Sequence, residues 1–381
     1  MSSDFAATLE TRGGETCRTA MMPHECPVHL HDMSRLLESL AVPIVQAPMA
    51  GGPSTPALAA AVSRAGGLGF LAAGYLTPER LQQDVAATRS QLDRFGVNVF
   101  VGGDRPADPE RVRAYAARLQ AEAVRAGVEL GQARFDDDWF EEKIDILRRD
   151  PVTVVSFTFG IPPERAIEQL QAARSEVWLT VTSPGEARLA VSAGADALIV
   201  QGVEAGGHRG VFVDDDSQSE LTLLAALQLV RAEVDVPLIA AGSIMTGAAL
   251  AAVLVAGASA AQIGTAYLRT PEAGTSPAQR AATATDTPTV LTRAFSGRLA
   301  RGISNRFDTD YGEDAPRAYP EINHLTSPLR AHGRAVGDPD LINLWAGQAH
   351  SLAETLPAEE ITRRLAQSAH DAIAASAARL R

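Results

Sequence analysis

The residues with the clearest capacity for chemistry in this chain lie in one glycine-rich segment, Gln201-Gly-Val-Glu-Ala-Gly-Gly-His-Arg-Gly210. The run before it, Ala197–Val200, is apolar on both faces, which is typical of a buried parallel strand. The four glycines of the segment disfavour a helix because each costs backbone entropy there, so a loop is expected. His208 has the only side chain in the loop with an unperturbed pKa near neutrality. The segment predicts either acid–base chemistry on an imidazole or a tight turn with an exposed histidine.

Residues in and near this loop suit the binding of a flat ligand. Gly206 and Gly207 lack a Cβ, so a planar group can lie against their backbone and meet their N–H groups. The amides of Gln201 and Asn98 can each donate and accept hydrogen bonds, which suits the uracil-like edge of an isoalloxazine. A buried amide that satisfies local backbone groups is the alternative for Asn98. The other candidates for contact with such a ring are Pro48 and Met49.

Eight apolar runs alternate with helical patterns along the chain. The strands that these runs predict have to position the loops. They lie at residues 43–47, 68–71, 96–101, 152–157, 177–181, 197–200, 236–241 and 260–264. Helix starts such as Thr77-Pro78 stand between them. Eight strand–helix pairs are the count of a (β/α)8 TIM barrel. The alternative, a doubly wound open sheet, lacks its G-x-G-x-x-G fingerprint here. The predicted fold is therefore α/β, a TIM barrel with a smaller C-terminal helical appendage.

Two loops of that barrel indicate a phosphate site. The loops after the seventh and eighth strands of a barrel commonly bind phosphate through backbone N–H groups. Here they contain Gly242-Ser243 and Gly264-Thr265, and Gln262 and Ile263 lead into the second. Ordinary turn chemistry explains one such pair, but two pairs in these two loops favour a phosphate monoester. A flat group with a single phosphate indicates FMN as the cofactor.

The chain is predicted to divide into three parts. Residues 1–33 are expected to form a disordered tail, residues 34–270 the FMN-binding barrel, and residues 271–381 a helical appendage that packs on the barrel and contributes to the substrate pocket. Helices are expected in the appendage at 276–285, 289–299 and 358–380. The tail contains Cys17, His24, Cys26, His29 and His31, whose spacing matches no zinc pattern, so no metal site is predicted.

Composition narrows the classes of partner. The 381 residues carry a formal net charge of −12, which argues against a nucleic-acid or anionic membrane surface. The chain contains no apolar run of about 18 residues, so no transmembrane helix is expected. Two cysteines in one segment do not suggest a disulfide framework, so the reducing cytoplasm is the predicted location. A small-molecule substrate is expected, and the protein is predicted to be a monomer or a homodimer.

Four ordered motifs carry a specific resemblance. Gln46-Ala-Pro-Met-Ala-Gly-Gly52, Phe95-Gly-Val-Asn-Val-Phe100, Phe157-Thr-Phe-Gly-Ile-Pro162 and Gln201-Gly-Val-Glu-Ala-Gly-Gly-His208 resemble the motifs of class I nitronate monooxygenases, formerly called 2-nitropropane dioxygenases. Gly242-Ser243 and Gln262-Ile-Gly-Thr265 are similar to that family's phosphate-binding segments. The resemblance covers about residues 36 to 335 and implies an FMN-bearing barrel with a smaller helical domain.

The resemblance also implies roles for single residues. His208 would be the catalytic residue above the flavin. The residues implied in FMN binding are Asn98, Gln201, Gly206, Gly242 and Gln262 to Thr265. Family members oxidise alkyl nitronates, including propionate 3-nitronate, with O2 to a carbonyl compound and nitrite, and they need no nicotinamide. We expect the nitronate to pass one electron to the flavin, which gives a semiquinone that O2 reoxidises.

The role of His208 and the substrate range stay open at this level. The imidazole could remove the α-proton of a neutral nitroalkane, or the imidazolium could hold the nitronate oxygens. Arg209 is expected on the surface. Arg301, Arg306 and Arg330 are the basic residues of the appendage that could meet a carboxylated nitronate, although surface salt bridges explain them equally well.

Two other functions compete with this interpretation. An FMN-dependent enoyl-carrier-protein reductase resembles the same barrel and shares the Glu-Ala-Gly-Gly-His segment, but it would consume NADH or NADPH. A barrel that binds a phosphorylated metabolite without redox chemistry is the second alternative. Gln201 before the shared segment, together with the first motif, favours the monooxygenase.

Overall fold

Eight parallel strands form a closed barrel at the centre of the molecule. The computed structural model describes residues 35–103, 106–215 and 220–379. The strand order is β1-β9-β8-β6-β5-β4-β3-β2, and a parallel bridge between Val45 and Leu68 joins the two edges. This confirms the predicted TIM barrel. The strands are β1 Ile44–Gln46, β2 Phe70–Ala72, β3 Gly96–Phe100, β4 Val154–Thr158, β5 Glu176–Val181, β6 Ala197–Gln201, β8 Leu238–Ala241 and β9 Ala260–Ile263.

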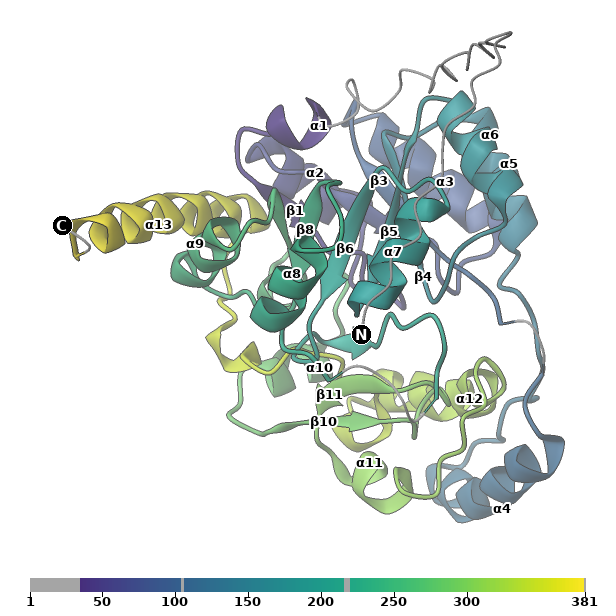
Figure 1. Ribbon diagram of the computed structural model, residues 1–381. Coiled ribbons are helices and arrows are strands. Elements are labelled where there is room, and N and C mark those ends of the chain that lie inside the picture. Colours follow the sequence, from purple (N-terminus) through teal and green to yellow (C-terminus); the bar gives the residue numbers. More distant parts are fainter. Residues whose placement is uncertain (1–34, 104–105, 216–219, 380–381) are drawn as a thin grey trace, which may run out of the picture.

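Helices surround the barrel and follow the strands in order (Figure 1). They begin at the capping residues that the sequence suggests; the Thr77 side chain, for example, accepts a hydrogen bond from the N–H of Arg80. The C-terminal helix α13 packs against α9 and α2, so it serves as the eighth helix of the ring. The helices of the ring are α2 Pro56–Arg64, α3 Pro78–Arg89, α5 Phe140–Arg149, α6 Glu164–Ala172, α7 Pro184–Ser192, α8 Leu223–Arg231, α9 Gly247–Val255 and α13 Ala358–Arg379.

A side-chain amide completes the seam between the two edge strands. Gln46 is fully buried. Its Nε2 donates to the carbonyl oxygen of Phe70 at 2.9 Å, and its Oε1 accepts from the N–H of Phe70 at 3.1 Å. The side-chain amide therefore pairs with both the N–H and the carbonyl group of Phe70, which the short ladder between the two edge strands would otherwise leave unpaired. Below the seam, the short helix α1 (Arg35–Glu38) packs Leu36 and Leu37 against the side chains inside the barrel.

A smaller cap covers the carboxyl ends of the barrel strands (Figure 1). It contains an antiparallel sheet in the order β10-β11-β7, with helices around it. The expected helix at 289–299 is wrong, because Thr289–Thr292 forms strand β10 and pairs with β11. Helix α12 lies between the helices expected at 289–299 and 358–380, where the sequence predicted none. The cap elements are α4 Pro109–Ala126, β7 Gly207–His208, α10 Pro277–Thr283, β10 Thr289–Thr292, β11 Ala300–Ile303, α11 Arg306–Tyr311 and α12 Glu321–Val336.

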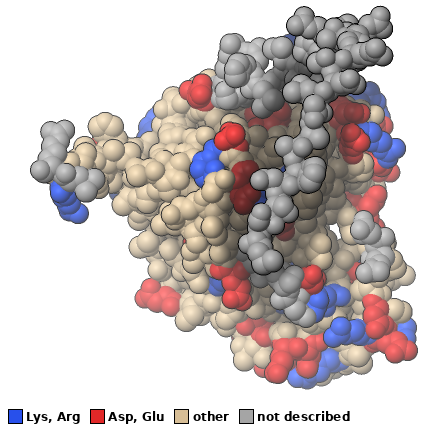
Figure 2. Space-filling view, in the orientation of Figure 1, with Lys and Arg blue, Asp and Glu red and all other residues tan. Residues whose placement is uncertain are grey.

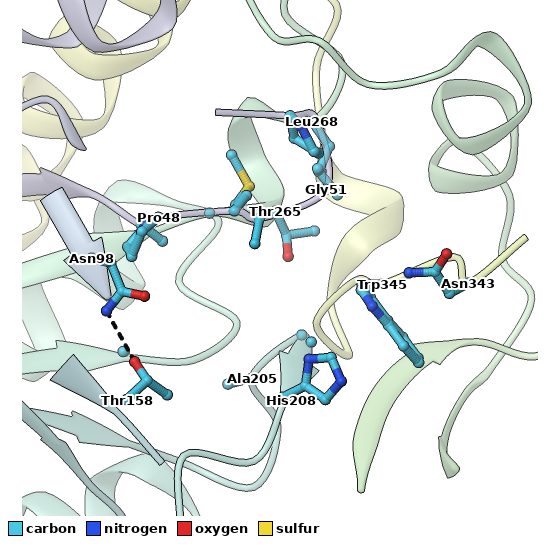
Figure 3. A pocket seen from close by; sticks show the side chains of 18 of the residues that line it. Pro48, Gly51, Asn98, Thr158, Ala205, His208, Thr265, Leu268, Asn343 and Trp345 are labelled. Carbon is cyan, nitrogen blue, oxygen red and sulfur yellow. Dashed lines mark hydrogen bonds between the residues drawn. The ribbon is translucent and has the colours of Figure 1, made fainter. Parts of the chain in front are cut away.

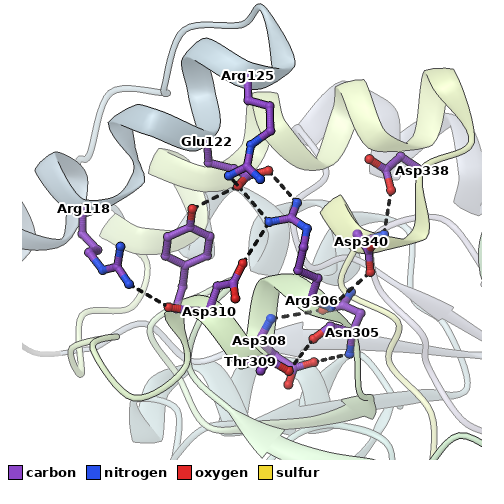
Figure 4. A network of polar contacts seen from close by, with 11 residues as sticks. Arg118, Glu122, Arg125, Asn305, Arg306, Asp308, Thr309, Asp310, Asp338 and Asp340 are labelled. Carbon is purple, nitrogen blue, oxygen red and sulfur yellow. Dashed lines mark hydrogen bonds and ion pairs between the residues drawn. The ribbon is translucent and has the colours of Figure 1, made fainter.

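The packing crosses the predicted boundary at residue 270 in two places. Helix α4 comes from the predicted barrel region but contributes to the apolar core of the cap. Its buried carboxylate, Glu122, accepts hydrogen bonds from Arg306 Nη2 at 2.7 Å and from the Tyr311 hydroxyl at 3.0 Å (Figure 4). In the other direction, α13 belongs to the barrel ring. The division into a barrel and an appendage stays a prediction, and the predicted tail, residues 1–33, lies outside the described residues.

The surface carries both signs of charge. On the face shown in Figure 2, acidic and basic side chains alternate over the cap. Such mixing does not provide the single-signed basic patch that nucleic-acid binding favours. No helix in the described part of the chain is long and apolar enough to cross a membrane.

The docking of α13 on the ring can be tested at Gly247, the first residue of α9. A Cβ there would lie 2.5 Å from the backbone nitrogen of Ala369 on α13. We expect Gly247→Ala to lower the free energy of unfolding by about 1–3 kcal/mol through overpacking, measured by urea denaturation. The matched control is Gly185→Ala in the first turn of α7, where the nearest atom, Ser183 Oγ, is 3.9 Å away. Equal stability of both variants would contradict the packing of α13 against α9.

Candidate active site

One cavity lies between the barrel mouth and the cap. Its volume is about 260 Å³, and it is lined from both sides. Figure 3 shows barrel residues such as Asn98 and cap residues such as Trp345 facing it. All the site residues predicted from the sequence line this cavity, namely Pro48, Met49, Asn98, Gln201, Gly206, Gly207, His208, Gly242, Ser243, Gln262, Ile263, Gly264 and Thr265. The structure thus brings these residues together, while their roles stay predictions.

Strand pairing, rather than a free loop, positions His208. Gly207 and His208 form β7, which pairs with β11 of the cap in the register His208↔Ala300 and Gly207↔Arg301. The alternative of an exposed histidine on a turn is therefore wrong. The loop after the sixth barrel strand becomes the edge of the cap sheet, so barrel and cap together fix the imidazole.

The imidazole is half-buried and lies among aromatic rings. The ring centroids of Trp345, Phe159 and Tyr319 lie 5.5, 5.7 and 5.9 Å from that of His208. Burial, with smaller contributions from the positive charges of Arg298 and Arg330, lowers the pKa of His208 to about 3. The imidazole is therefore neutral at physiological pH, because both effects disfavour its charged form.

A serine on the cap selects the tautomer of His208. The Nε2 atom lies 2.8 Å from Ser296 Oγ, and that hydroxyl lies 3.1 Å from the carbonyl oxygen of Arg298. If the hydroxyl donated to Nε2, two oxygen acceptors would face each other without a proton. The hydroxyl therefore donates to the carbonyl and accepts from Nε2–H. This assignment leaves Nδ1 as the basic nitrogen of the ring.

Hydrogen bonds from the side chains of Gln201 and Arg209 hold the histidine loop in place. The Gln201 amide donates through Nε2 to the carbonyl oxygen of His208 at 3.0 Å. Its Oε1 accepts from Arg209 Nη1 at 3.0 Å and from the N–H of Gly210 at 2.9 Å. Arg209 also donates to the carbonyl oxygen of Gly202 at 2.7 Å and is only 2% exposed. The expected surface position of Arg209 is therefore wrong, and burial lowers its pKa to about 10.

The two positions before His208 favour glycine for different structural reasons. A Cβ on Gly206 would lie 2.5 Å from backbone atoms of Ala346 and Gly347, so this glycine allows the cap backbone to approach. Gly207 has open space beside it but adopts a φ of +78°, which favours glycine. Gly206 therefore lines the cavity and also lets the cap backbone approach, and its contact with a ligand stays a prediction.

The barrel floor offers an amide oxygen to the cavity. Asn98 Nδ2 donates to Ser156 Oγ and to Thr158 Oγ1, both at 3.0 Å. Figure 3 shows the amide nitrogen turned to Thr158 and the oxygen turned the other way, on the side of Pro48. The sequence alternative of local satisfaction therefore holds for the nitrogen, while the oxygen is left as an acceptor for a ligand.

The far end of the cavity offers unpaired backbone donors. No described residue accepts a hydrogen bond from the N–H groups of Ser243, Gly264 or Thr265. The Ser243 hydroxyl donates to the carbonyl oxygen of Glu204 at 2.8 Å, and the Thr265 hydroxyl accepts from the N–H of Gly347 at 3.0 Å. The hydroxyls thus hold neighbouring segments, and the N–H groups are available for an anion.

A buried acceptor nearby also has no partner. Gln262 is 6% exposed, and its Oε1 forms no hydrogen bond with any described residue. An orphaned buried acceptor is costly unless a ligand donor meets it. A ribityl hydroxyl would be such a donor. The unpaired N–H groups, the Gln262 oxygen and the Asn98 oxygen therefore fit a flat cofactor with one phosphate, such as FMN.

Sequence reasoning missed part of the cavity lining. Tyr75 follows the second strand, so the rule that strand ends form the site could have found it. Nothing in the sequence pattern indicated the lining residues of the cap, namely Ser296, Asn323, Arg334, Asn343 and Trp345. Of the three arginines considered for a carboxylate, only Arg330 lines the cavity. Arg301 donates to the carbonyl oxygen of Val203, and Arg306 pairs with Glu122.

The protonation of His208 gives a direct test. We expect its imidazole to stay neutral, as the Nε2–H tautomer, from about pH 5 to pH 8, measured by 15N chemical shifts. The folded pKa lies below the unfolded value of about 6.5, so the unfolded chain binds more protons between these values. The stability from this group is complete above the unfolded pKa and is lost as the pH falls toward 3. An imidazole that titrates near pH 6.5 would contradict the buried geometry.

Comparisons with known proteins agree with this geometry. A family model described as nitronate monooxygenase matches residues 34–368. A protein named probable nitronate monooxygenase from Staphylococcus aureus strain Newman is 40% identical over 340 residues, which are 86% of this chain and 95% of that protein. The crystal structure of nitroalkane oxidase from Streptomyces ansochromogenes is similar with a TM-score of 0.87 and 46% identity, over 89% of this chain and 99% of the other. FabK from Thermotoga maritima is similar with a TM-score of 0.72 and 26% identity, over 91% and 98% of the two chains. The chain, an oxidoreductase, therefore belongs to the nitronate monooxygenase family.

Proposed function

We propose that this oxidoreductase binds FMN and oxidises alkyl nitronates with O2 to a carbonyl compound and nitrite. The observation that carries the proposal is one cavity with a neutral, half-buried imidazole on the cap side and unpaired backbone N–H donors at the barrel seam. Family membership supports flavin-type oxidation of nitro compounds, and the donor and acceptor set supports FMN as the particular flavin.

The residues that would hold FMN follow from their free polar groups. The N–H groups of Ser243, Gly264 and Thr265 would bind the phosphate, and Gln262 Oε1 would accept from the ribityl chain. Met49 also lines the cavity, next to Gly264. Because Gly264 has no side chain, nothing from that residue lies between Met49 and the cavity. When bound, FMN supplies the electron acceptor that O2 restores.

The environment of His208 favours one of its two roles. An imidazolium that holds the nitronate oxygens would need a raised pKa, whereas burial and two arginines lower it. We therefore assign His208 as the base that removes the α-proton of a neutral nitroalkane, at Nδ1. Ser296 orients the ring through Nε2, and the aromatic rings exclude water from it. A nitronate arrives already deprotonated and does not need this step.

Cofactor and substrate class can be tested with one preparation. We expect the purified protein to be yellow or to become so with added FMN, and to lose the visible band of oxidised flavin when mixed anaerobically with ethyl nitronate. The band should return with O2, and nitrite should accumulate. NADPH or NADH should not bleach the band at a comparable rate. Rapid bleaching by a nicotinamide would favour the enoyl-carrier-protein reductase, and a protein that binds no flavin would favour the non-redox barrel.

The base role predicts a split between two substrates. We expect His208→Asn to retain FMN and to lower kcat/KM for nitroethane by about 10²–10⁴, the usual contribution of a general base. Its kcat/KM for ethyl nitronate should fall far less, because no proton has to be removed. The matched control is His370→Asn on α13, whose side chain is 82% exposed. Steady-state assays of nitrite release measure both, and full nitroethane activity in His208→Asn would remove the imidazole from the reaction.

A further inference from the structure

Two side chains that line the cavity have hydrogen-bond donors that the fold does not fully use. Arg330 on α12 is 9% exposed. Its Nε donates to Thr326 Oγ1 at 3.1 Å, and its Nη2 donates to the carbonyl oxygen of Asn323 at 2.6 Å. Its Nη1 has no hydrogen-bond partner in the described part of the chain. The second donor is at the Tyr75 hydroxyl, which is buried beside the Tyr319 hydroxyl. Because two hydroxyls share only one hydrogen bond between them, one O–H hydrogen of this pair lacks an acceptor among the described residues. Buried donors of this kind are costly unless a ligand satisfies them.

The charge of Arg330 is also uncompensated. Arg306 in the same cap pairs with Glu122 and Asp310. By contrast, no carboxylate of the described residues pairs with Arg330, and burial lowers its pKa to about 10. A buried guanidinium without an anion is unfavourable. Because Arg330 lines the cavity, the anion that completes it is expected to be a ligand.

Tyr75 is held in place by a strained backbone. Its φ is +69°, a conformation that non-glycine residues rarely adopt. Its N–H donates to both carboxylate oxygens of Asp138, at 3.1 and 3.3 Å. Asp138, which also has a positive φ, pairs with the buried Lys143 at 2.6 Å. Strain that the surrounding structure maintains is typical of functional positions, and here it presents the phenol to the cavity.

We propose that Arg330 and Tyr75 bind the two oxygens of the substrate's nitro or nitronate group. This inference rests on the proposed function. The ring of Tyr319 lies 5.9 Å from that of His208, and its hydroxyl lies beside that of Tyr75, so His208 and Tyr75 line the same part of the cavity. The positive charge of Arg330, which also lines the cavity, acts on both. The nitro oxygens are two bonds from the α-carbon, so a nitro group held there presents its α-proton to the imidazole. As the proton leaves, negative charge grows on those oxygens, and the guanidinium stabilises it.

Binding of an unreactive planar oxyanion tests this subsite independently of turnover. Nitrate is titrated into the FMN-loaded wild type and into Arg330→Met, Arg330→Lys and Tyr75→Phe, with calorimetry as the readout. We expect nitrate to bind the wild type, with a Kd raised about ten- to hundredfold in Arg330→Met and several-fold in Tyr75→Phe. Arg330→Lys should retain part of the affinity, because it keeps the charge. The matched controls are Arg118→Met and Tyr311→Phe, outside the cavity. Nitrate affinity that is unchanged in both Arg330→Met and Tyr75→Phe overturns the proposal.

Turnover then identifies the group that Arg330 binds. We expect Arg330→Met to lower kcat/KM for ethyl nitronate and for propionate 3-nitronate by similar factors, because both carry the nitronate group. A loss confined to propionate 3-nitronate would show that Arg330 binds the carboxylate instead, and the proposal would be wrong. If the wild type oxidises neither nitronate, the proposed function fails, while the nitrate titration still decides the subsite. If Arg330→Met does not fold, Arg330→Lys and Tyr75→Phe carry both tests.

A pH profile separates an electrostatic role from a structural one. The groups that act on the imidazole are Arg298 and Arg330, with Tyr319 and Ser296 beside the ring. Removing the charge of Arg330 should raise the pKa of His208 toward its ordinary value. The acid limb of kcat/KM for nitroethane should therefore move to higher pH in Arg330→Met and not in Arg118→Met. An unmoved limb would contradict the placement of Arg330 next to the base.

Discussion

The pairing of β7 with β11 is the interaction on which the rest of the site depends. Two residues from the loop after the sixth barrel strand join the edge of the cap sheet. This pairing fixes the backbone of His208, and the Gln201 amide ties the carbonyl of the same residue back to the barrel. The position of the imidazole therefore depends on both the barrel and the cap. Because Gly206 lets the cap backbone approach within contact distance, the cavity is closed on the side of the histidine loop.

The second organising feature is a separation of polar groups along the cavity. Around His208, the cap contributes buried positive charge and aromatic rings; Arg298, for example, lies 4.0 Å above the ring of Phe159. At the barrel seam, residues 242–245 and 262–265 contribute neutral backbone donors and contain no lysine or arginine. A phosphate bound there, as we propose, would be held by dipoles, and the positive charge of Arg330 would act on the substrate. This arrangement suits a reaction in which negative charge develops on the substrate.

The parts of the fold and the site that could be predicted are those that a short stretch of sequence determines. The barrel strands were found because each is a short apolar run between glycine or proline signals, and Thr77-Pro78 marked a helix start that the structure confirms. The cap was predicted less well. Residues 289–299 were expected to form a helix but form β10 and a turn, because the partner of β10 is β11, whose other edge pairs with β7 from a distant part of the chain. Likewise, Arg209 looked like a surface residue because no local pattern shows that Gln201 and Gly202 receive its donors.

By itself, the sequence determined the barrel, the strand ends that meet at its mouth and the residue types that such a mouth offers to a ligand, because strand periodicity and backbone preferences act over a few residues. Only the tertiary structure decided the state of those residues. It lowered the pKa of the imidazole by packing it among aromatic rings near two arginines, fixed its tautomer through Ser296, and left donors of Arg330 and Tyr75 incompletely paired. Those properties depend on desolvation and on contacts between segments far apart in the chain, which no local pattern records.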